Sequence, residues 1–164
     1  MDSIRIFGYK SFKKLSVQLH PINLLIGANG AGKSNFLSLF EMLGNIYEKR
    51  LGAYVAQVGG VDKLLYQGRK VTDRIAVNLL IAKSEYDLAL LESDGKLIVE
   101  REVVGCYDDV CPLDLVRKNV ITEFQSESSL KDHKEEDLSN YISQIRKFHF
   151  HDTGRRSPFT ADSH

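Results

Sequence analysis

The sequence predicts an α/β fold with some α+β character, in which helices flank a mixed sheet that includes an antiparallel meander. Three observations predict this fold. A glycine-rich segment lies between a short apolar run, 22–26, and a helix-periodic segment that begins at Lys33. Apolar and polar residues alternate along 75–90, as is typical of half-buried antiparallel strands. Apolar residues recur at helical spacing within 138–145, which predicts a further helix.

The start of the chain predicts strands on the amino-terminal side of the glycine-rich segment. Residues 4–6 and 15–19 alternate apolar and polar side chains, which predicts an antiparallel pair of half-buried strands joined by a turn at 8–12. The run 22–26 is continuously apolar, which predicts a buried parallel strand. Helical spacing then extends from residue 34 to about residue 48, and this helix is expected to pack on the sheet.

The middle of the chain predicts short elements and then the meander. Residues 52–60 are rich in small side chains and are expected to form a loop or a broken helix, whereas 61–65 fits a single helical turn. Alternation along 75–90 predicts antiparallel strands, and Asp94-Gly95 is a strong signal for a hairpin before the next strand at 97–99.

The last third of the chain is less regular. Residues 105–112 are expected to be a connection, and 113–124 fits a strand and a helix equally well. Asp132 followed by Glu135 resembles a capping pair before the helix near 138–145. Residues 147–151 then alternate as a strand would.

Composition restricts the class of protein. The chain has 164 residues, enough for one domain with a sizeable core. Lys+Arg and Asp+Glu are both 22, so net charge gives no argument for a nucleic-acid or membrane surface. The sequence lacks the roughly 18 uninterrupted apolar residues of a membrane span, so a cytoplasmic protein with no membrane partner is expected. Cys106 and Cys111 are expected to be free thiols.

The segment from Gly27 to Ser34 fits G-x-x-x-x-G-K-[ST], the phosphate-binding loop of nucleoside triphosphatases. Such a loop wraps backbone N–H groups around phosphate oxygens, and glycines leave room for that approach. Lys33 would reach the β- and γ-phosphates of ATP, and the Ser34 hydroxyl would bind Mg²⁺. The candidate cofactor-binding residues here are Gly27, Asn29, Gly30, Ala31, Gly32, Lys33, Ser34 and Asn35. The alternative is a glycine-rich turn that caps a core helix and leaves Lys33 in solvent.

Residues 24–36 resemble the N-terminal end of the ATP-binding-cassette superclass that includes SMC, RecF and related AAA-type ATPases. In that superclass a strand, a turn with a basic residue and a second strand precede the phosphate loop, and Lys10 lies in the corresponding turn here. The resemblance implies that Lys10 touches the nucleotide phosphates; an exposed turn lysine is the alternative. It also implies a homodimer around two ATP molecules and a role in DNA repair or defence.

Residues 148–153 are similar to a Phe-His-Asp-Thr segment of bacterial ATPases related to RecF, some of them in phage-defence systems. The resemblance places His151 where the superclass has the Gln of its Q-loop, which senses the nucleotide and contacts Mg²⁺. Two alternatives stay open: hydrogen-bonded histidines at the end of a strand, and an independent metal site with His149 and Asp152. Gln125 is a second candidate for the sensor.

Hydrolysis of ATP also needs an acidic residue at the end of an apolar strand and a base that orients water. No clear match occurs, and 103–109 is the nearest candidate. The Ser-Gly signature of the superclass is absent as well. Residues 1–164 are therefore expected to be an incomplete N-terminal lobe that binds ATP and Mg²⁺ and hydrolyses ATP negligibly alone. A nucleotide-dependent module that binds a partner protein without hydrolysis is the alternative, and binding to DNA rests on the resemblance alone.

Overall fold

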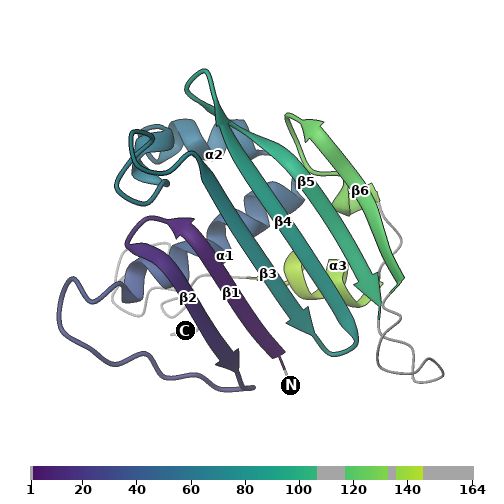
Figure 1. Cartoon of the computed structure of the whole chain (residues 1–164). Helices are drawn as coiled ribbons and strands as arrows, with labels where there is room; N and C mark the ends of the chain where they lie inside the picture. The colour runs from purple at the N-terminus through teal and green to yellow at the C-terminus, as the bar shows by residue number, and fades with distance from the viewer. Residues whose placement is uncertain (1, 107–116, 133–135, 146–164) are drawn as a thin grey trace, which may run out of the picture.

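The computed structural model describes residues 2–106, 117–132 and 136–145. Within them, six antiparallel strands form one sheet in the order β2-β1-β3-β4-β5-β6, and the helices lie together behind it in the view of Figure 1. The strands are β1 (Asp2–Tyr9), β2 (Phe12–Leu19), β3 (Arg74–Ile81), β4 (Ser84–Ser93), β5 (Lys96–Cys106) and β6 (Arg117–Gln125). The helices are α1 (Lys33–Tyr47), α2 (Leu51–Gln57) and α3 (Glu136–Ser143), with short 3₁₀ turns η1 (Val61–Lys63) and η2 (Leu130–Asp132).

The core lies between the covered face of the sheet and the helices. Alternate residues of β3 and β4, such as Val77 and Leu88, are buried, which confirms the predicted half-buried meander. The apolar stripe of α1 faces this layer, and Leu39 and Leu43 are almost fully buried. Burial of each such side chain contributes about 1.5–3 kcal/mol to folding, so the stripe holds α1 and the residues before it against the sheet.

The hairpins of the meander agree with the sequence. Asp94 and Gly95 both have positive φ, 50° and 77°, as the type I′ turn of a two-residue hairpin requires. Ser93 pairs with Lys96 directly across this turn. At the start of the chain, β1 and β2 pair through the register Ile4↔Val17 and confirm the predicted antiparallel pair.

The prediction of a mixed sheet with a buried parallel strand at 22–26 is wrong. All six described strands are antiparallel, and residues 22–26 belong to a long loop between β2 and α1 (Figure 1). Ile22, Leu24 and Ile26 are 89%, 80% and 84% exposed. A buried parallel strand needs parallel neighbours, and no described strand supplies one beside β2.

Other expectations are refined. Residues 51–57 form the short helix α2, which buries Leu51, Tyr54 and Val55, so the small-residue segment is helical before its glycines. The expected connection at 105–112 is wrong for Gly105 and Cys106, because pairing with β4 and β6 keeps both in β5. The ambiguous segment is a strand where it is described, from Arg117 onward.

The predicted helix near 138–145 is α3, which begins at Glu136 and buries Leu138 and Ile142. Glu135, the strand expected at 147–151 and Cys111 lie outside the described residues. No described helix is both long and apolar enough to cross a membrane.

A carboxylate lies inside the core. Glu102 on β5 is fully buried and accepts hydrogen bonds from the hydroxyls of Tyr86 and Ser128 and from the backbone N–H of Ser129, at 2.5, 2.6 and 3.0 Å. Burial, together with the nearby Glu102 carboxylate, raises the pKa of Tyr86 well above its usual value. These bonds fasten the segment after β6 to the sheet.

Candidate functional site

The glycine-rich segment contains two positions that favour glycine. Gly30 and Gly32 have φ of +84° and +93°, in the left-handed region. A Cβ at Gly32 would lie 3.1 Å from the Phe12 ring and 3.2 Å from Ser11 Oγ, whereas a Cβ at Gly30 would meet nothing within 4 Å. The loop is therefore pressed against the β1–β2 turn at Gly32 and open at Gly30.

The start of α1 has the properties of an anion site. Gly32 precedes the helix, no side chain caps the helix, and its first turn contains no acidic residue. Its first N–H groups and the positive end of the helix dipole therefore face no competing carboxylate of that turn. Ser34 is exposed at this end. This arrangement fits phosphate, because backbone N–H groups at a helix start are the usual donors to phosphate oxygens.

Lys33 folds over the loop. Its ammonium donates hydrogen bonds to the carbonyl oxygens of Gly27 and Ala28, at 2.5 and 2.7 Å. These neutral acceptors are weaker partners for an ammonium than anionic phosphate oxygens. Lys33 can therefore exchange a carbonyl for a phosphate without leaving the loop. Asn29 and Ala31, two further predicted site residues, are exposed on the same loop.

The structure brings Lys10 to the side of α1. Lys10 has φ of +46° in the β1–β2 turn, and its ammonium donates to Ser38 Oγ at 2.8 Å. The Asn35 side-chain amide donates to Ser11 Oγ in the same turn, at 2.9 Å. The β1–β2 turn is thus hydrogen-bonded to the first turns of α1, and Lys10 and Asn35 lie near the helix start.

Ser38 is a residue that sequence reasoning missed. It is buried on α1, shares a hydrogen bond with the Tyr9 hydroxyl at 2.9 Å, and donates to the Asn35 carbonyl oxygen at 2.8 Å. The Tyr54 hydroxyl donates to the Ser38 carbonyl oxygen at 3.3 Å. Burial raises the pKa of both Tyr9 and Tyr54, so both hydroxyls stay protonated at neutral pH. The signal in the sequence was a serine on the apolar stripe of the helix.

Two hollows adjoin the loop. The first, of about 270 Å³, is mainly apolar and lies between β2, the 24–26 segment and the start of α1. The second, of about 810 Å³, is lined by Lys10, Asn35 and residues of the 62–70 segment. Among the described residues that line these two hollows, Asp62 is the one carboxylate, and it accepts from the backbone N–H of Arg69 at 2.9 Å.

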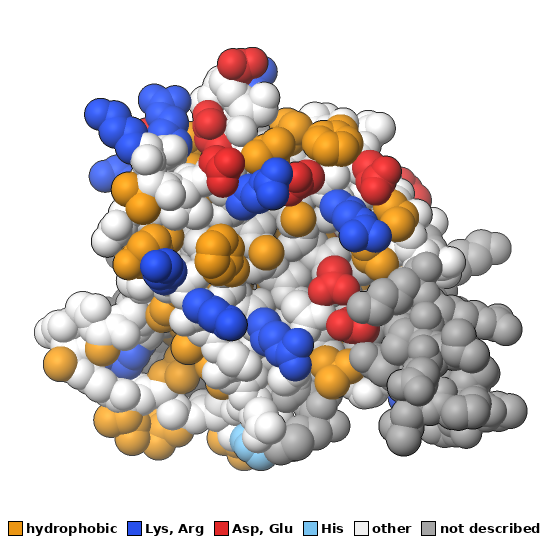
Figure 2. All heavy atoms as spheres, viewed as in Figure 1, with side chains coloured by type: hydrophobic (Ala, Val, Ile, Leu, Met, Phe, Trp, Pro, Cys, Tyr) orange, Lys and Arg blue, Asp and Glu red, His pale blue; other side chains and the backbone are white. Residues whose placement is uncertain are grey.

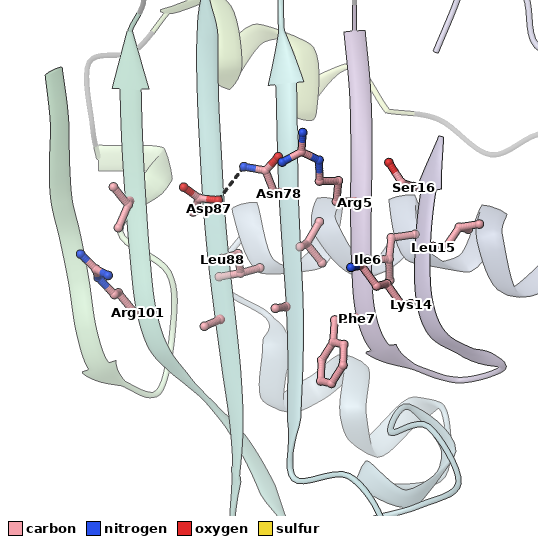
Figure 3. Close-up of a pocket in the computed structure, with 14 residues that line it drawn as sticks. Arg5, Ile6, Phe7, Lys14, Leu15, Ser16, Asn78, Asp87, Leu88 and Arg101 are labelled. Atoms are coloured by element: carbon pink, nitrogen blue, oxygen red, sulfur yellow. Dashed lines mark hydrogen bonds between the residues drawn. The ribbon is translucent and has the colours of Figure 1, made fainter. Parts of the chain in front are cut away.

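A third hollow, of about 640 Å³, lies on the open face of the sheet, away from the helices. Figure 3 shows Arg5, Phe7, Asn78 and Asp87 around it, with the Asn78 amide donating to Asp87 at 2.6 Å. Because α1 covers the opposite face, this hollow is separate from the start of α1.

The structure describes one of the two candidate sensor residues, Gln125, and not the other, His151. Gln125 is the last residue of β6, which is one edge strand of the sheet, whereas β2, the strand before the glycine-rich loop, is the other edge strand. Five strand spacings, roughly 24 Å, therefore separate β6 from β2. His151, together with His149 and Asp152, lies outside the described residues. Within the described part of the chain, no three His, Cys, Asp or Glu side chains come together as metal ligands.

The chain matches the model of a known protein family. A family model described as an AAA ATPase domain matches residues 1–152, most of the chain. The matched span includes the strand pair, the glycine-rich loop, α1 and the meander. No curated protein matches the chain. No solved structure matches it either.

Proposed function

The chain belongs to the AAA ATPase domain family, whose members are nucleotide-binding ATPases, and from this premise we propose that its 27–34 loop binds the triphosphate of ATP. One observation carries the proposal. Gly30 and Gly32, both with positive φ, precede a helix start that has neither a side-chain cap nor an acidic residue in its first turn. The Lys33 ammonium is hydrogen-bonded to the loop before this helix start. Loop, helix and lysine together form the donor set that phosphate requires.

Each part of the proposed site has its own role in binding ATP. Backbone N–H groups from Gly27 to Ser34 surround the phosphates, and Lys33 adds a charge-assisted contact. Mg²⁺, when bound, neutralises charge on the β- and γ-phosphates. The Ser34 hydroxyl is exposed where it can bind that ion. Asn35 and Lys10 flank the helix start, where Lys10 can touch the nucleotide phosphates, as the resemblance to the cassette superclass implies.

Further parts of the proposal rest on the resemblance to SMC/RecF-like ATPases. We propose that ATP binding joins two copies of the chain, that His151 senses the nucleotide and contacts its Mg²⁺, and that hydrolysis serves DNA repair or defence. The dimer is tested by light scattering, which should show the mass double on addition of ATP and Mg²⁺. An unchanged mass at saturating ATP would contradict the dimer.

One observation favours a second function, a nucleotide-dependent module that binds a partner protein without hydrolysis. Asp62, the one carboxylate lining the two described hollows beside the loop, is engaged by Arg69. It is therefore poorly placed to activate water. Dimers that form with ATP and persist while no phosphate is released would support this function, whereas steady phosphate release would support the ATPase.

Competition between nucleotides tests the contact with phosphates. We expect fluorescent ATP to be displaced by ATP more readily than by ADP, and only weakly by AMP, because the proposed donors contact the terminal phosphates. Equal displacement by ATP and AMP would show that the protein recognises adenosine and would contradict the proposed pose.

A further inference from the structure

Beside the phosphate loop lies the second hollow described above, which we call the basic hollow. It is defined by the cations Lys10, Lys63, Arg69 and Lys70 together with Asn35, Asp62, Leu65, Gln67 and Gly68, and its volume is about 810 Å³. Figure 2 shows Lys and Arg side chains gathered at the upper left of its view, over the connection between α2 and β3. We propose that the basic hollow is a second phosphate-binding site, separate from the phosphate loop.

The wall of the basic hollow is held in place by the core. Leu64 and Leu65 are buried, and Leu65 forms an isolated β-bridge with Tyr9 at the end of β1. The backbone N–H of Lys10 donates to the Leu64 carbonyl oxygen at 2.7 Å, and that of Tyr66 donates to the Gly8 carbonyl oxygen at 2.9 Å. These contacts fix the 62–70 segment against the β1–β2 turn and bring Lys10 to cations more than fifty residues away in the chain.

The turn that carries Arg69 and Lys70 is also specified. Gly68 has φ of +75°, and a Cβ there would lie 3.2 Å from Asp62 Oδ1. Asp62 accepts from the Arg69 backbone N–H at 2.9 Å and forms an ion pair with Arg69 Nε at 3.4 Å. Asp62 therefore holds the turn, and Gly68 lets the carboxylate approach it closely.

The charges of the basic hollow favour an anion. Four cations against the single carboxylate of Asp62 leave a surplus of three positive charges (4 − 1) among the residues that line it. Lys63, Arg69 and Lys70 are exposed, so their charged groups are accessible to a ligand. The sugar and base of ATP are neutral, and a site for them alone has no need of these cations. Phosphate groups match them in charge and in acceptor geometry.

The basic hollow adjoins the phosphate loop without coinciding with it. Of the predicted residues from Gly27 to Asn35, Asn35 alone lines the basic hollow. Lys10 also lines it, and its ammonium is hydrogen-bonded to Ser38 on α1, the helix that follows the phosphate loop. None of the residues from Gly27 to Ser34 lines the basic hollow. A phosphate-bearing ligand can therefore bind there while ATP occupies the loop, and the proposal holds whether or not the loop binds ATP.

The test separates the two sites with matched variants of the full chain. Lys63→Ala/Lys70→Ala removes two charges from the basic hollow and leaves the Asp62–Arg69 turn intact. Lys33→Ala removes the loop cation, and Lys13→Ala/Lys96→Ala removes two exposed charges that line neither site. Two probes distinguish the source of the phosphate: inorganic pyrophosphate, and a short single-stranded oligodeoxythymidylate. Each is titrated by calorimetry in the presence of saturating ATP, and circular dichroism checks that every variant folds.

We expect at least one probe to bind the unchanged chain and to lose ten-fold or more in affinity with Lys63→Ala/Lys70→Ala. Lys33→Ala and the Lys13→Ala/Lys96→Ala control should bind that probe within two-fold of the unchanged chain. Tighter binding of the oligonucleotide would identify a nucleic-acid backbone as the source, and tighter binding of pyrophosphate a small phosphate ligand. Failure of both probes to bind, or equal losses in Lys63→Ala/Lys70→Ala and its control, would overturn the proposal. ATP binding lost only in Lys63→Ala/Lys70→Ala would also overturn it, because the cations would then serve the nucleotide.

Discussion

The contact between Gly32 and the β1–β2 turn predicts a specific cost for Gly32→Ala. An alanine at this position would have to keep the backbone φ of +93°, which costs about 1–2 kcal/mol for an L-residue. Its Cβ would also lie 3.1 Å from the Phe12 ring, and relief of such overpacking typically costs about 1–3 kcal/mol. The free energy of unfolding should therefore fall by roughly 2–5 kcal/mol in total.

Two other glycines provide matched controls. Gly30 has φ of +84° with nothing within 4 Å of a built Cβ, so Gly30→Ala carries the backbone cost alone, about 1–2 kcal/mol. Gly44 lies inside α1 with open space around its Cβ, so Gly44→Ala should stabilise the protein by about 0.5–1 kcal/mol.

Urea unfolding followed by circular dichroism measures all three variants. In a domain of this size 1 kcal/mol shifts Tm by about 2–4 °C, so the order Gly44→Ala above Gly30→Ala above Gly32→Ala is also measurable by heat. Equal destabilisation by Gly30→Ala and Gly32→Ala would refute the reasoning, because it would show that the contact with Phe12 carries no energy.

Three further predictions concern the buried polar groups. Tyr86→Phe removes a donor to fully buried Glu102 and should lower the free energy of unfolding by about 1–3 kcal/mol, measured in urea; an unchanged value would show that this bond adds nothing. Ser38→Ala should cost a similar amount, about 1–3 kcal/mol, and a double-mutant cycle with Tyr9→Phe should show coupling, whereas strict additivity would contradict their hydrogen bond. Burial raises the pKa of Tyr9, Tyr54 and Tyr86 in the folded protein, so folding retains protons that the unfolded chain loses above pH 10. Stability is therefore fully present below about pH 10 and should fall as pH rises above it, with a shallower fall in Tyr86→Phe; a flat profile from pH 9 to 11 would contradict this.

The antiparallel strands and hairpins of the sheet were predictable because their sequence signals are local. Alternation along β3 and β4 and the Asp94-Gly95 turn each depend on neighbouring residues, and the structure confirms both. The 22–26 segment was not predictable in this way. A continuous apolar run shows that burial is favourable, but pairing depends on strands elsewhere in the chain, and none of the described strands pairs with this segment.

In the candidate site, too, the features encoded by one contiguous segment were predictable and the contacts between distant segments were not. The helix start at Lys33 was predictable from one contiguous motif, and the positive φ of Gly30 and Gly32 is compatible with the proposed phosphate loop. Ser38 was overlooked because its hydrogen bonds to Tyr9 and Lys10 cross from α1 to the β1–β2 turn. The basic hollow brings Lys10 together with cations of the 63–70 segment, which is far away in the chain, so its cations gave no pattern in the sequence.

The proposed triphosphate site depends most directly on Lys33, and calorimetric titration with ATP and Mg²⁺ tests it. Lys33→Ala should weaken ATP binding by about ten- to a hundredfold, the equivalent of roughly 1.5–3 kcal/mol for a lost charge-assisted contact. Lys96→Ala, which removes an exposed lysine at the β4–β5 hairpin, should bind as the unchanged chain does. Unchanged ATP affinity in folded Lys33→Ala would contradict the assignment of the 27–34 loop as the triphosphate site.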